Sequence, residues 1–269
     1  MLTLNNISKT FNKGTVNEKV ALQSLSLHLN PGDFVTIIGG NGAGKSTLFN
    51  SIGGTFLADT GSIILDNTDL TFLPEHKRAA YIGRMFQDPL KGTAPNMTIE
   101  ENLALAYLRG VKRNGILGLT NADRIYFKER LAALDLGLET RLKSKVGLLS
   151  GGQRQALTLL MATLVTPKLL LLDEHTAALD PATAEKVLAL TKKIVADSNI
   201  TCMMITHNIH SALQLGNRTI MMDNGQIILD ISGDERKKMT VEMLLEKFRQ
   251  KSQKAFDNDR ILLSTAADK

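Results

Sequence analysis

The chain has 269 residues, of which 43% are hydrophobic and 22% are charged, and its formal net charge is +5 at pH 7. This is the composition of an ordinary globular protein, and a chain of this length buries a large core without needing a disulfide or a structural metal. The longest apolar stretch, residues 156–165, is too short for a membrane-spanning helix, which needs about 18 residues. Any membrane part of a working assembly therefore belongs to another chain.

Two further features concern location and partners. Residues 1–6 lack the basic start and long apolar stretch of a signal peptide, and the single cysteine, Cys202, fits a reducing cytoplasm. The basic residues are dispersed, with one modest cluster at Arg109, Lys112 and Arg113. Because nucleic-acid binding requires clustered positive charge, we expect a solvated surface and no nucleic-acid partner.

The amino-terminal third is typical of β-structure. Leucines alternate with polar residues at 2–4 and at 25–29, the period of half-buried strands. Residues 34–38 form a continuous apolar run, as in a buried parallel strand. A glycine-rich turn follows this run, and we expect a helix from Lys45.

Residues 88–145 differ from the preceding part of the chain, because Leu, Ala, Arg and Glu are frequent there and helical spacing occurs at 98–108 and 123–136. We interpret them as a helical subdomain inserted into an α/β body. The α/β pattern then returns, and the predicted elements are a helix at 153–165, a strand at 169–172, a helix beginning at Pro181, a strand at 201–205 and a hairpin whose turn is Asn224-Gly225. Residues 241–248 can form an amphipathic helix, and we expect a weakly ordered end after residue 250, in which residues 261–263 can dock.

Residues 39–46 match the phosphate-binding pattern G-x-x-x-x-G-K-[ST] between a buried strand and a helix. The glycines let successive backbone N–H groups point at phosphate oxygens, and the helix N-terminus adds partial positive charge. Lys45 is expected to reach the β- and γ-phosphates, and the Ser46 hydroxyl to bind Mg²⁺. The alternative is a glycine-rich turn that binds nothing. The nucleotide-binding residues predicted here are Gly39, Asn41, Gly42, Ala43, Gly44, Lys45, Ser46 and Thr47.

Two acids, Asp173 and Glu174, follow the apolar strand at 169–172. At the end of a strand, Asp173 can hold Mg²⁺ directly or through its water, and Glu174 can polarise the attacking water. The alternative is a pair of carboxylates that caps a surface strand. The phosphate-binding loop upstream favours the functional interpretation.

Residues 149–153 have the sequence Leu-Ser-Gly-Gly-Gln and precede a predicted helix. Ser150, Gly152 and Gln153 would build a second anion-binding helix N-terminus. Taken alone, such a stretch is more often a capped helix after a glycine turn. One ATP does not need two phosphate-binding helix ends from one chain, so a head-to-tail dimer in which each chain closes its partner's ATP is the economical account.

The pentapeptide, in this order between the phosphate-binding loop and the acidic strand, resembles the signature of ABC ATPases. The resemblance covers residues 2–229. It implies an α/β fold, with a P-loop NTPase core of the ABC ATPase type, an antiparallel β subdomain and an inserted helical subdomain. We expect an ABC ATPase domain at 1–232, its helical subdomain at about 88–145, and a carboxyl-terminal helical extension and tail at 233–269.

Further positions follow from the resemblance. Gln87 resembles the Q-loop glutamine, which senses the γ-phosphate and the membrane partner and would join Ser46 and Asp173 as a Mg²⁺ ligand. Asp180 lies in a segment that resembles the D-loop at the dimer interface, and His207 resembles the switch histidine that contacts the γ-phosphate. Phe11 resembles the aromatic residue that stacks on adenine, where tyrosine is more usual. By themselves, Gln87 and His207 would be surface or capping residues.

One residue departs from the family pattern. Most members have proline after the catalytic glutamate, whereas this chain has His175. Residues 174–181 and 14–18 nevertheless resemble ATPase subunits of bacterial importers assigned to amino acids, including aromatic ones. Glu174 itself is present, so the departure leaves the catalytic assignment unchanged.

The implied function is ATP hydrolysis that powers import of a small solute, such as an amino acid, at the cytoplasmic face of the cell membrane. The chain would be peripheral, would bind ATP and Mg²⁺, and would act with a second ATPase copy, a membrane permease and an extracellular solute-binding protein. An exporter subunit remains an alternative. A soluble nucleic-acid ATPase is a weaker one, because long coiled coils and a second cassette are absent from the sequence. A permease helix would enter a groove between residues 87–90 and the following helices. Its candidate lining residues, each of which fits a core position equally well, are Tyr81, Phe86, Met97 and Leu103.

Overall fold

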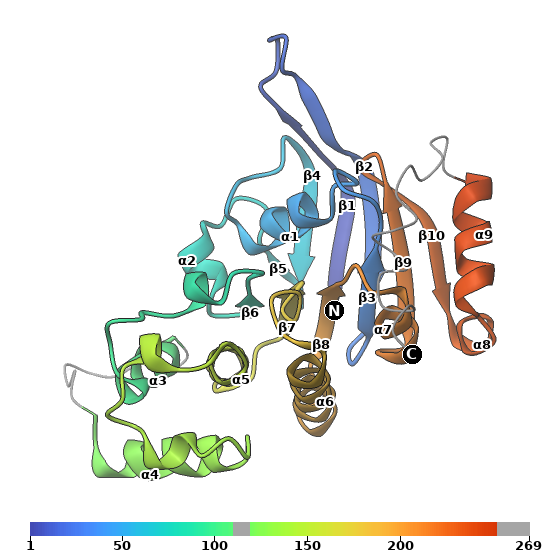
Figure 1. Ribbon diagram of the computed structural model, residues 1–269. Coiled ribbons are helices and arrows are strands. Elements are labelled where there is room, and N and C mark those ends of the chain that lie inside the picture. The colour runs from blue at the N-terminus through green and yellow to red at the C-terminus, as the bar shows by residue number, and fades with distance from the viewer. Residues whose placement is uncertain (110–118, 252–269) are drawn as a thin grey trace. The chain divides into compact units, whose positions relative to one another are not determined.

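The computed structural model describes residues 1–109 and 119–251 (Figure 1). Its chain forms two compact units. The first unit contains Met1–Arg78 together with the chain from Thr201 onward, and the second contains Ala79–Ile200. The basic residues Lys112 and Arg113 lie outside the described residues. So does the end that was expected to be weakly ordered after residue 250, except for Lys251, together with residues 261–263, which were expected to dock.

The first unit contains an antiparallel sheet with the strand order β2-β1-β4-β5. Its strands are β1 (Leu2–Phe11), β2 (Lys19–Leu29), β4 (Thr60–Leu65) and β5 (Thr68–Asp69). Leu2 pairs with Leu29, and Leu4 pairs with Leu27. These four leucines are buried, because successive side chains in a strand point to opposite faces and the alternating leucines share one of them.

The other strands of this unit follow the order β10-β9-β3-β8. Strand β3 (Phe34–Ile38) runs parallel to β8 (Thr201–Ile205) and to β9 (Arg218–Asp223), whereas β10 (Gln226–Ser232) is antiparallel to β9. The β9–β10 turn has positive φ at both Asn224 and Gly225, as a two-residue hairpin turn requires. Every residue of β3 and β8 is buried, which explains their continuous apolar runs.

Short helices complete the first unit: α1 (Lys45–Gly53), α2 (Glu75–Arg78), α7 (Ile209–Gln214), α8 (Gly233–Lys237) and α9 (Val241–Lys251). Helix α9 lies beside β10 (Figure 1), and its buried Leu244 and Phe248 belong to a core cluster with Ile231 and Ala212. The amphipathic helix predicted at 241–248 is therefore present, and its apolar face covers this end of the unit.

A buried arginine, which the sequence pattern did not single out, holds the end of α1. Arg78 is fully buried and donates hydrogen bonds to the carbonyl oxygens of Ser51 (2.6 Å) and Ile52 (2.9 Å) in the last turn of α1. A cation there satisfies carbonyls that have no partner within the helix. A Cβ at Gly54 would lie 2.8 Å from the Arg78 Nε, so glycine is required at this close approach.

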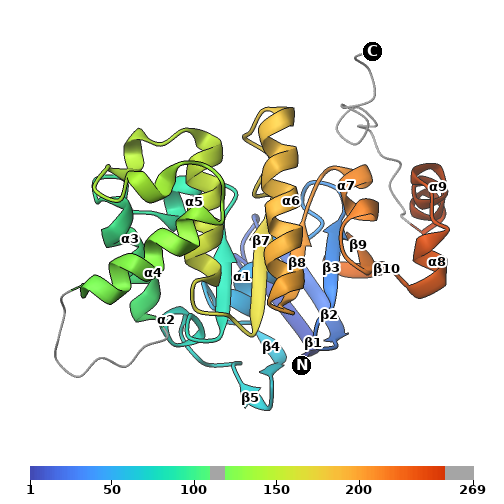
Figure 2. The ribbon, with the colours of Figure 1, turned by 90° about the horizontal axis from the view of Figure 1, so that it is seen from below.

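The second unit combines two parallel strands with a helical cluster (Figure 2). Its elements are β6 (Ile82–Met85), η1 (Pro89–Gly92), α3 (Ile99–Leu108), α4 (Asn121–Ala132), η2 (Leu138–Thr140), η3 (Val146–Leu148), α5 (Gly151–Thr163), β7 (Leu169–Asp173) and α6 (Pro181–Asp197). Buried residues of α3, α4 and α5 share one core, which includes Leu103, Phe127 and Leu157. Helix α4 ends before the predicted residue 136, because Asp135 and Gly137 adopt left-handed backbone conformations that a helix cannot contain.

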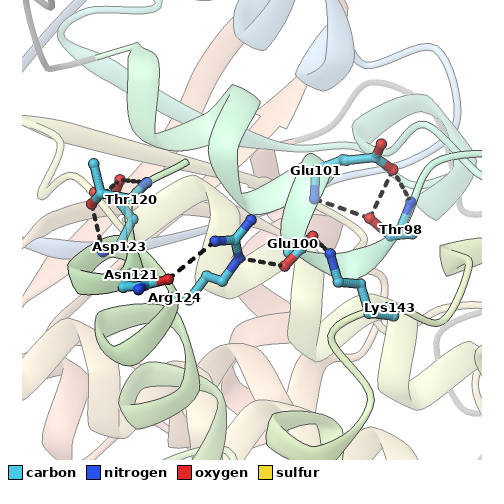
Figure 3. A network of polar contacts seen from close by, with 8 residues as sticks. All are labelled: Thr98, Glu100, Glu101, Thr120, Asn121, Asp123, Arg124 and Lys143. Atoms are coloured by element: carbon cyan, nitrogen blue, oxygen red, sulfur yellow. Dashed lines mark hydrogen bonds and ion pairs between the residues drawn. The ribbon is translucent and has the colours of Figure 1, made fainter. Parts of the chain in front are cut away.

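Polar groups fix how the helices begin and meet (Figure 3). Thr98 caps α3 in a reciprocal arrangement with Glu101, and Thr120 caps α4 in the same way with Asp123. The Glu100 side chain is only 6% exposed and accepts hydrogen bonds from Arg124 of α4, at 3.3 Å, and from Lys143. One buried carboxylate thus links α3, α4 and the segment that leads to η3.

Replacing Glu100 with Gln is expected to lower the free energy of unfolding by about 1–2 kcal/mol. A hydrogen bond to a charged group contributes about 1.5–3 kcal/mol, and part of this returns when the exposed cations regain water. Urea denaturation measures the change. Glu129→Gln is the matched control, since Glu129 is exposed on α4 and such surface changes stay within about 0.5 kcal/mol. Equal stability of the two variants would show that the Glu100 network contributes nothing.

Candidate active site

The loop between β3 and α1 is shaped so that only glycine fits at its ends. A Cβ on Gly39 would lie 2.3 Å from the carbonyl oxygen of Met222, and one on Gly44 would lie 2.6 Å from that of Ala21. Gly44 also has φ of 98°, in the left-handed region. The loop therefore packs against β2 and β9 by its backbone. The predicted loop residues Asn41, Gly42 and Ser46 are exposed, Thr47 is partly buried, and Ala43, Gly44 and Lys45 are buried.

Lys45 begins α1, and its ammonium group folds back over the loop. Its Nζ donates to the carbonyl oxygens of Gly39 at 2.8 Å and Gly40 at 3.0 Å, and the residue is only 6% exposed. The positive end of the α1 dipole lies at the same place. A buried cation, a helix N-terminus and a curled backbone in one loop form an anion site suited to phosphate.

His207 lies at the same edge of the parallel strands as this loop. In the β3–β8 register, Ile37 pairs with Ile205, and the Thr206 amide donates to the Ile37 carbonyl oxygen at 3.1 Å. His207 is the next residue and is partly buried. Because parallel strands end at a common edge, the switch histidine predicted from the sequence and the phosphate loop belong to one strand edge.

Phe11 ends β1, in the same unit as the phosphate loop. Its ring packs edge-to-face against Phe56, with centroids 5.2 Å apart, and the Lys9 Nζ lies 5.8 Å from its centroid. The ring is partly buried. These contacts fix the ring orientation, and its role in stacking on adenine stays a prediction.

In the second unit, the acidic residues lie where β7 ends, and Gln87 meets them. Met85 of β6 pairs with Leu172 of β7, so the residues that follow both strands leave the same edge. The Gln87 Nε2 donates to the Glu174 Oε2 at 3.0 Å. Asp173, the last residue of β7, is partly buried. The structure therefore brings together three residues that the sequence predicted to act on the γ-phosphate, Mg²⁺ and the attacking water.

His175 follows Glu174 and is 1% exposed. Its Nε2 lies 3.1 Å from the Oγ1 of Thr191 on α6. Burial lowers the pKa of His175 to about 4, so the imidazole is neutral at neutral pH. The sequence showed His175 only as a departure from proline, and no local signal identified Thr191 as its partner, because the contact joins a turn to the middle of a helix.

The signature residues form a capped helix N-terminus. The Ser150 Oγ accepts from the Gln153 amide, the Gln153 Oε1 accepts from the Ser150 amide, and each distance is 3.2 Å. Gly152 abuts the first turn of α6, because a Cβ there would lie 2.3 Å from the Thr183 Cγ2. Asp180 caps α6 by accepting from the Thr183 amide at 3.0 Å, and this hydrogen bonding lowers the pKa of Asp180. The signature and the D-loop segment thus meet through Thr183.

The comparisons with known proteins agree with this arrangement. Residues 22–177 match the family model described as ABC transporter. The chain is 46% identical over 248 residues to a tyrosine transport ATP-binding protein of Clostridioides difficile. The alignment covers 92% of this chain and 98% of that relative. It is 35% identical to a methionine import ATP-binding protein of Histophilus somni, over 85% of this chain and 64% of that longer protein.

Solved structures of the same kind are similar in fold. A dimeric ATP-binding cassette in a post-hydrolysis state, bound to ADP and Pi, is 30% identical, with a TM-score of 0.74 over 86% of this chain and 98% of that one. A cassette of an ABC transporter in its ADP conformation is 29% identical, with a TM-score of 0.76 over 93% of this chain and 98% of that one.

No helix in the described part of the chain is both long and apolar enough to cross a membrane. The glycine loop at the end of β3, the acids at the end of β7 and the capped N-terminus of α5 all lie within residues 22–177, which match the family model. The chain therefore belongs to the ABC transporter family, as an ATP-binding subunit that hydrolyses ATP.

Proposed function

We propose that this subunit powers the import of an aromatic amino acid through a separate membrane permease. The observation that carries the proposal is the similarity to the tyrosine transport ATP-binding protein. The two chains are 46% identical, and the alignment covers 98% of that relative. The permease and an extracellular solute-binding protein are the partners that such an importer requires, and the chain would act at the cytoplasmic face of the membrane.

The substrate proposal is tested with the complex that this subunit forms with the permease and the binding protein encoded by neighbouring genes. After purification from membranes and reconstitution in vesicles, the complex should hydrolyse ATP faster with tyrosine-loaded binding protein than with unloaded protein. Labelled tyrosine should move toward the side that holds the ATPase subunits. Transport of another solute with no response to aromatic amino acids would overturn the substrate assignment, and movement in the opposite direction would indicate an exporter.

The proposed chemistry assigns a role to each residue of the site. Lys45 and the amides of residues 39–47 hold the β- and γ-phosphates, and Glu174 orients and polarises the attacking water. Gln87 contacts Glu174 directly, so it can respond to the presence of the γ-phosphate beside that carboxylate. His207 is the second residue assigned to contact the γ-phosphate. Phe11 stacks on the adenine ring. Across the dimer, Ser150, Gly152 and Gln153 of one chain close on the ATP of the other, and Asp180 lies at that interface.

Magnesium is proposed from the chemistry of the donors. Ser46, Asp173 and Gln87 offer a hydroxyl, a carboxylate and an amide oxygen, the hard oxygen ligands that Mg²⁺ prefers. The hydrogen bond from the Gln87 Nε2 to Glu174 leaves the amide oxygen of Gln87 as an acceptor. The ion would neutralise charge on the phosphates, while the protein residues position the water and the nucleotide.

A cavity in the second unit is the proposed docking site for a cytoplasmic helix of the permease. It has a volume of about 380 Å³, and α3, α5 and the segment 91–94 line it. Leu105 is 54% exposed and provides an apolar anchor beside Ala106 and Met161, while Arg84, Lys91 and Arg109 provide positive charge. We infer a partner helix with apolar anchors at i, i+3, i+4 spacing and acidic residues at its edge.

The four residues expected to line the permease groove differ in burial, and their part in docking stays a prediction for the three that are partly buried: Tyr81, Phe86 and Met97. Leu103 is fully buried in the helical core, and Tyr81, Phe86 and Met97 are not among the cavity-lining residues. Residues two apart on a helix point in very different directions, so the core takes Leu103 and leaves Leu105 at the surface.

Replacing Leu105 with Glu is expected to abolish co-purification with the permease and to leave ATP binding unchanged. The variant loses the apolar anchor, and its carboxylate would repel the acidic residues inferred at the edge of the partner helix and compete with them for the cations of the cavity. Affinity purification of the complex measures association. Ile125→Glu is the matched control, since Ile125 is 59% exposed on α4 and lies outside the cavity. Retained association in the Leu105 variant, or equal loss in both variants, would contradict this docking site.

A further inference from the structure

The backbone at Glu174 adopts a conformation that its neighbours must maintain. Its φ is 46°, in the left-handed region, which residues with a side chain avoid. Two turn hydrogen bonds follow, from the Ala177 amide to the Glu174 carbonyl oxygen at 3.0 Å and from the Leu179 amide to that of Thr176 at 3.2 Å. The direction of the Glu174 carboxylate therefore depends on what holds this turn.

The imidazole of His175 connects the turn to α6. Both His175 and Thr191 are almost completely buried, and 3.1 Å separates the His175 Nε2 from the Thr191 Oγ1. The Thr191 Oγ1 lies 2.8 Å from the Val187 carbonyl oxygen, to which it donates. A hydroxyl has only one hydrogen to donate, so the Thr191 oxygen accepts from His175. The imidazole is thus the tautomer with its proton on Nε2.

Helix α6 is a firm anchor for this contact. It begins at Pro181 with a side-chain cap from Asp180 and continues to Asp197. Val187, Thr191 and Val195 are spaced four residues apart and are all buried, so they form the packed face of the helix. A hydrogen bond to the middle of this face ties the turn after β7 to a fixed element.

We propose that His175 is a positioning residue for Glu174, because its hydrogen bond to Thr191 fixes the turn and thereby the direction of the Glu174 carboxylate. The proposal rests on the proposed role of Glu174 in activating water. His175 does not touch the reacting atoms, and it acts only through its neighbour. A small displacement of a catalytic group can lower the rate by up to about 100-fold.

The test removes the acceptor and keeps the shape. Thr191→Val should lower kcat about tenfold, with the KM for ATP unchanged within about twofold, because the residues proposed to hold the phosphates, 39–47, lie outside this turn. Thr191→Ser retains the hydroxyl and should restore kcat to near the wild-type value. Thr163→Val is the matched control, since Thr163 also donates to the carbonyl four residues before it, Leu159 at 2.8 Å, and should leave kcat unchanged.

The histidine side of the bond is tested independently. The side-chain amide of Gln can take the place of the imidazole Nε2 as a donor, so His175→Gln should retain most of kcat, whereas His175→Leu should lose it as Thr191→Val does. If the Leu variant fails to fold, the Thr191 pair still decides. Wild-type kcat in Thr191→Val, or equal loss in the Ser and Val variants, would overturn the proposal.

A double variant separates positioning from general damage. In a Glu174→Gln background the residual hydrolysis no longer uses the carboxylate, so adding Thr191→Val should cause no further loss. A further tenfold loss there would show that Thr191 acts by another route and would overturn the proposal. Near wild-type hydrolysis in Glu174→Gln alone would instead reject the proposed role of Glu174, so the two failures are distinguishable.

Discussion

The Glu174→Gln variant is expected to bind ATP and to hydrolyse it about 10²–10⁴-fold more slowly than the wild type, the usual contribution of a general base. The amide has nearly the shape of the carboxylate but cannot accept a proton from water. The amide oxygen can still accept the hydrogen bond from the Gln87 Nε2, which lies 3.0 Å from the Glu174 Oε2 in the structure. With hydrolysis blocked, the variant should accumulate as an ATP-bound dimer.

Steady-state phosphate release measures the rate, and size-exclusion chromatography in ATP measures the dimer. Glu185→Gln is the matched control, because Glu185 is an exposed carboxylate on α6 and its loss should leave hydrolysis unchanged. A rate within tenfold of the wild type for Glu174→Gln would reject the assigned role.

Local signals in the sequence predicted much of the fold. The apolar run at 34–38 and the glycines after it specify a buried strand and a tight loop, and both are where the pattern places them. The Asn-Gly pair at 224 and 225 predicts the β9–β10 hairpin for the same reason, since few residues tolerate positive φ. Patterns within about ten residues determine these elements.

Features that depend on distant contacts were less predictable. The buried Arg78 binds carbonyl groups more than 25 positions earlier in the sequence, and His175 binds Thr191 of the following helix. Periodicity also did not show which leucine of α3 faces the core. Among the site residues, Gln87 and His207 were identified only through the resemblance, because neither belongs to a distinctive local pattern.

The second large effect concerns the sharing of sites between two chains. Lys45→Ala removes the buried ammonium group of the phosphate loop, and several charged hydrogen bonds, each worth about 1.5–3 kcal/mol, would be lost from the bound phosphates. Hydrolysis is expected to fall by more than about 100-fold. Ser150→Arg removes the cap of α5 and fills the helix N-terminus that should face the partner's ATP, so it should be comparably inactive.

These two lesions lie on opposite sides of the proposed composite site. In a heterodimer of one Lys45→Ala chain and one Ser150→Arg chain, one site contains both lesions and the other contains neither. In homodimers of either variant, every site contains one lesion. Sharing of sites therefore predicts a gain on mixing, whereas sites contained within single chains predict none.

The most direct measurement is the trapping of radiolabelled ATP by the mixed heterodimer, with Glu174→Gln present in both chains to prevent hydrolysis. Shared sites should give one tightly held ATP per heterodimer and none in either homodimer. Absence of trapped ATP in the heterodimer would contradict an ATP site that two chains share. Wild-type hydrolysis by a monomeric Ser150→Arg chain that retains Glu174 would contradict it as well.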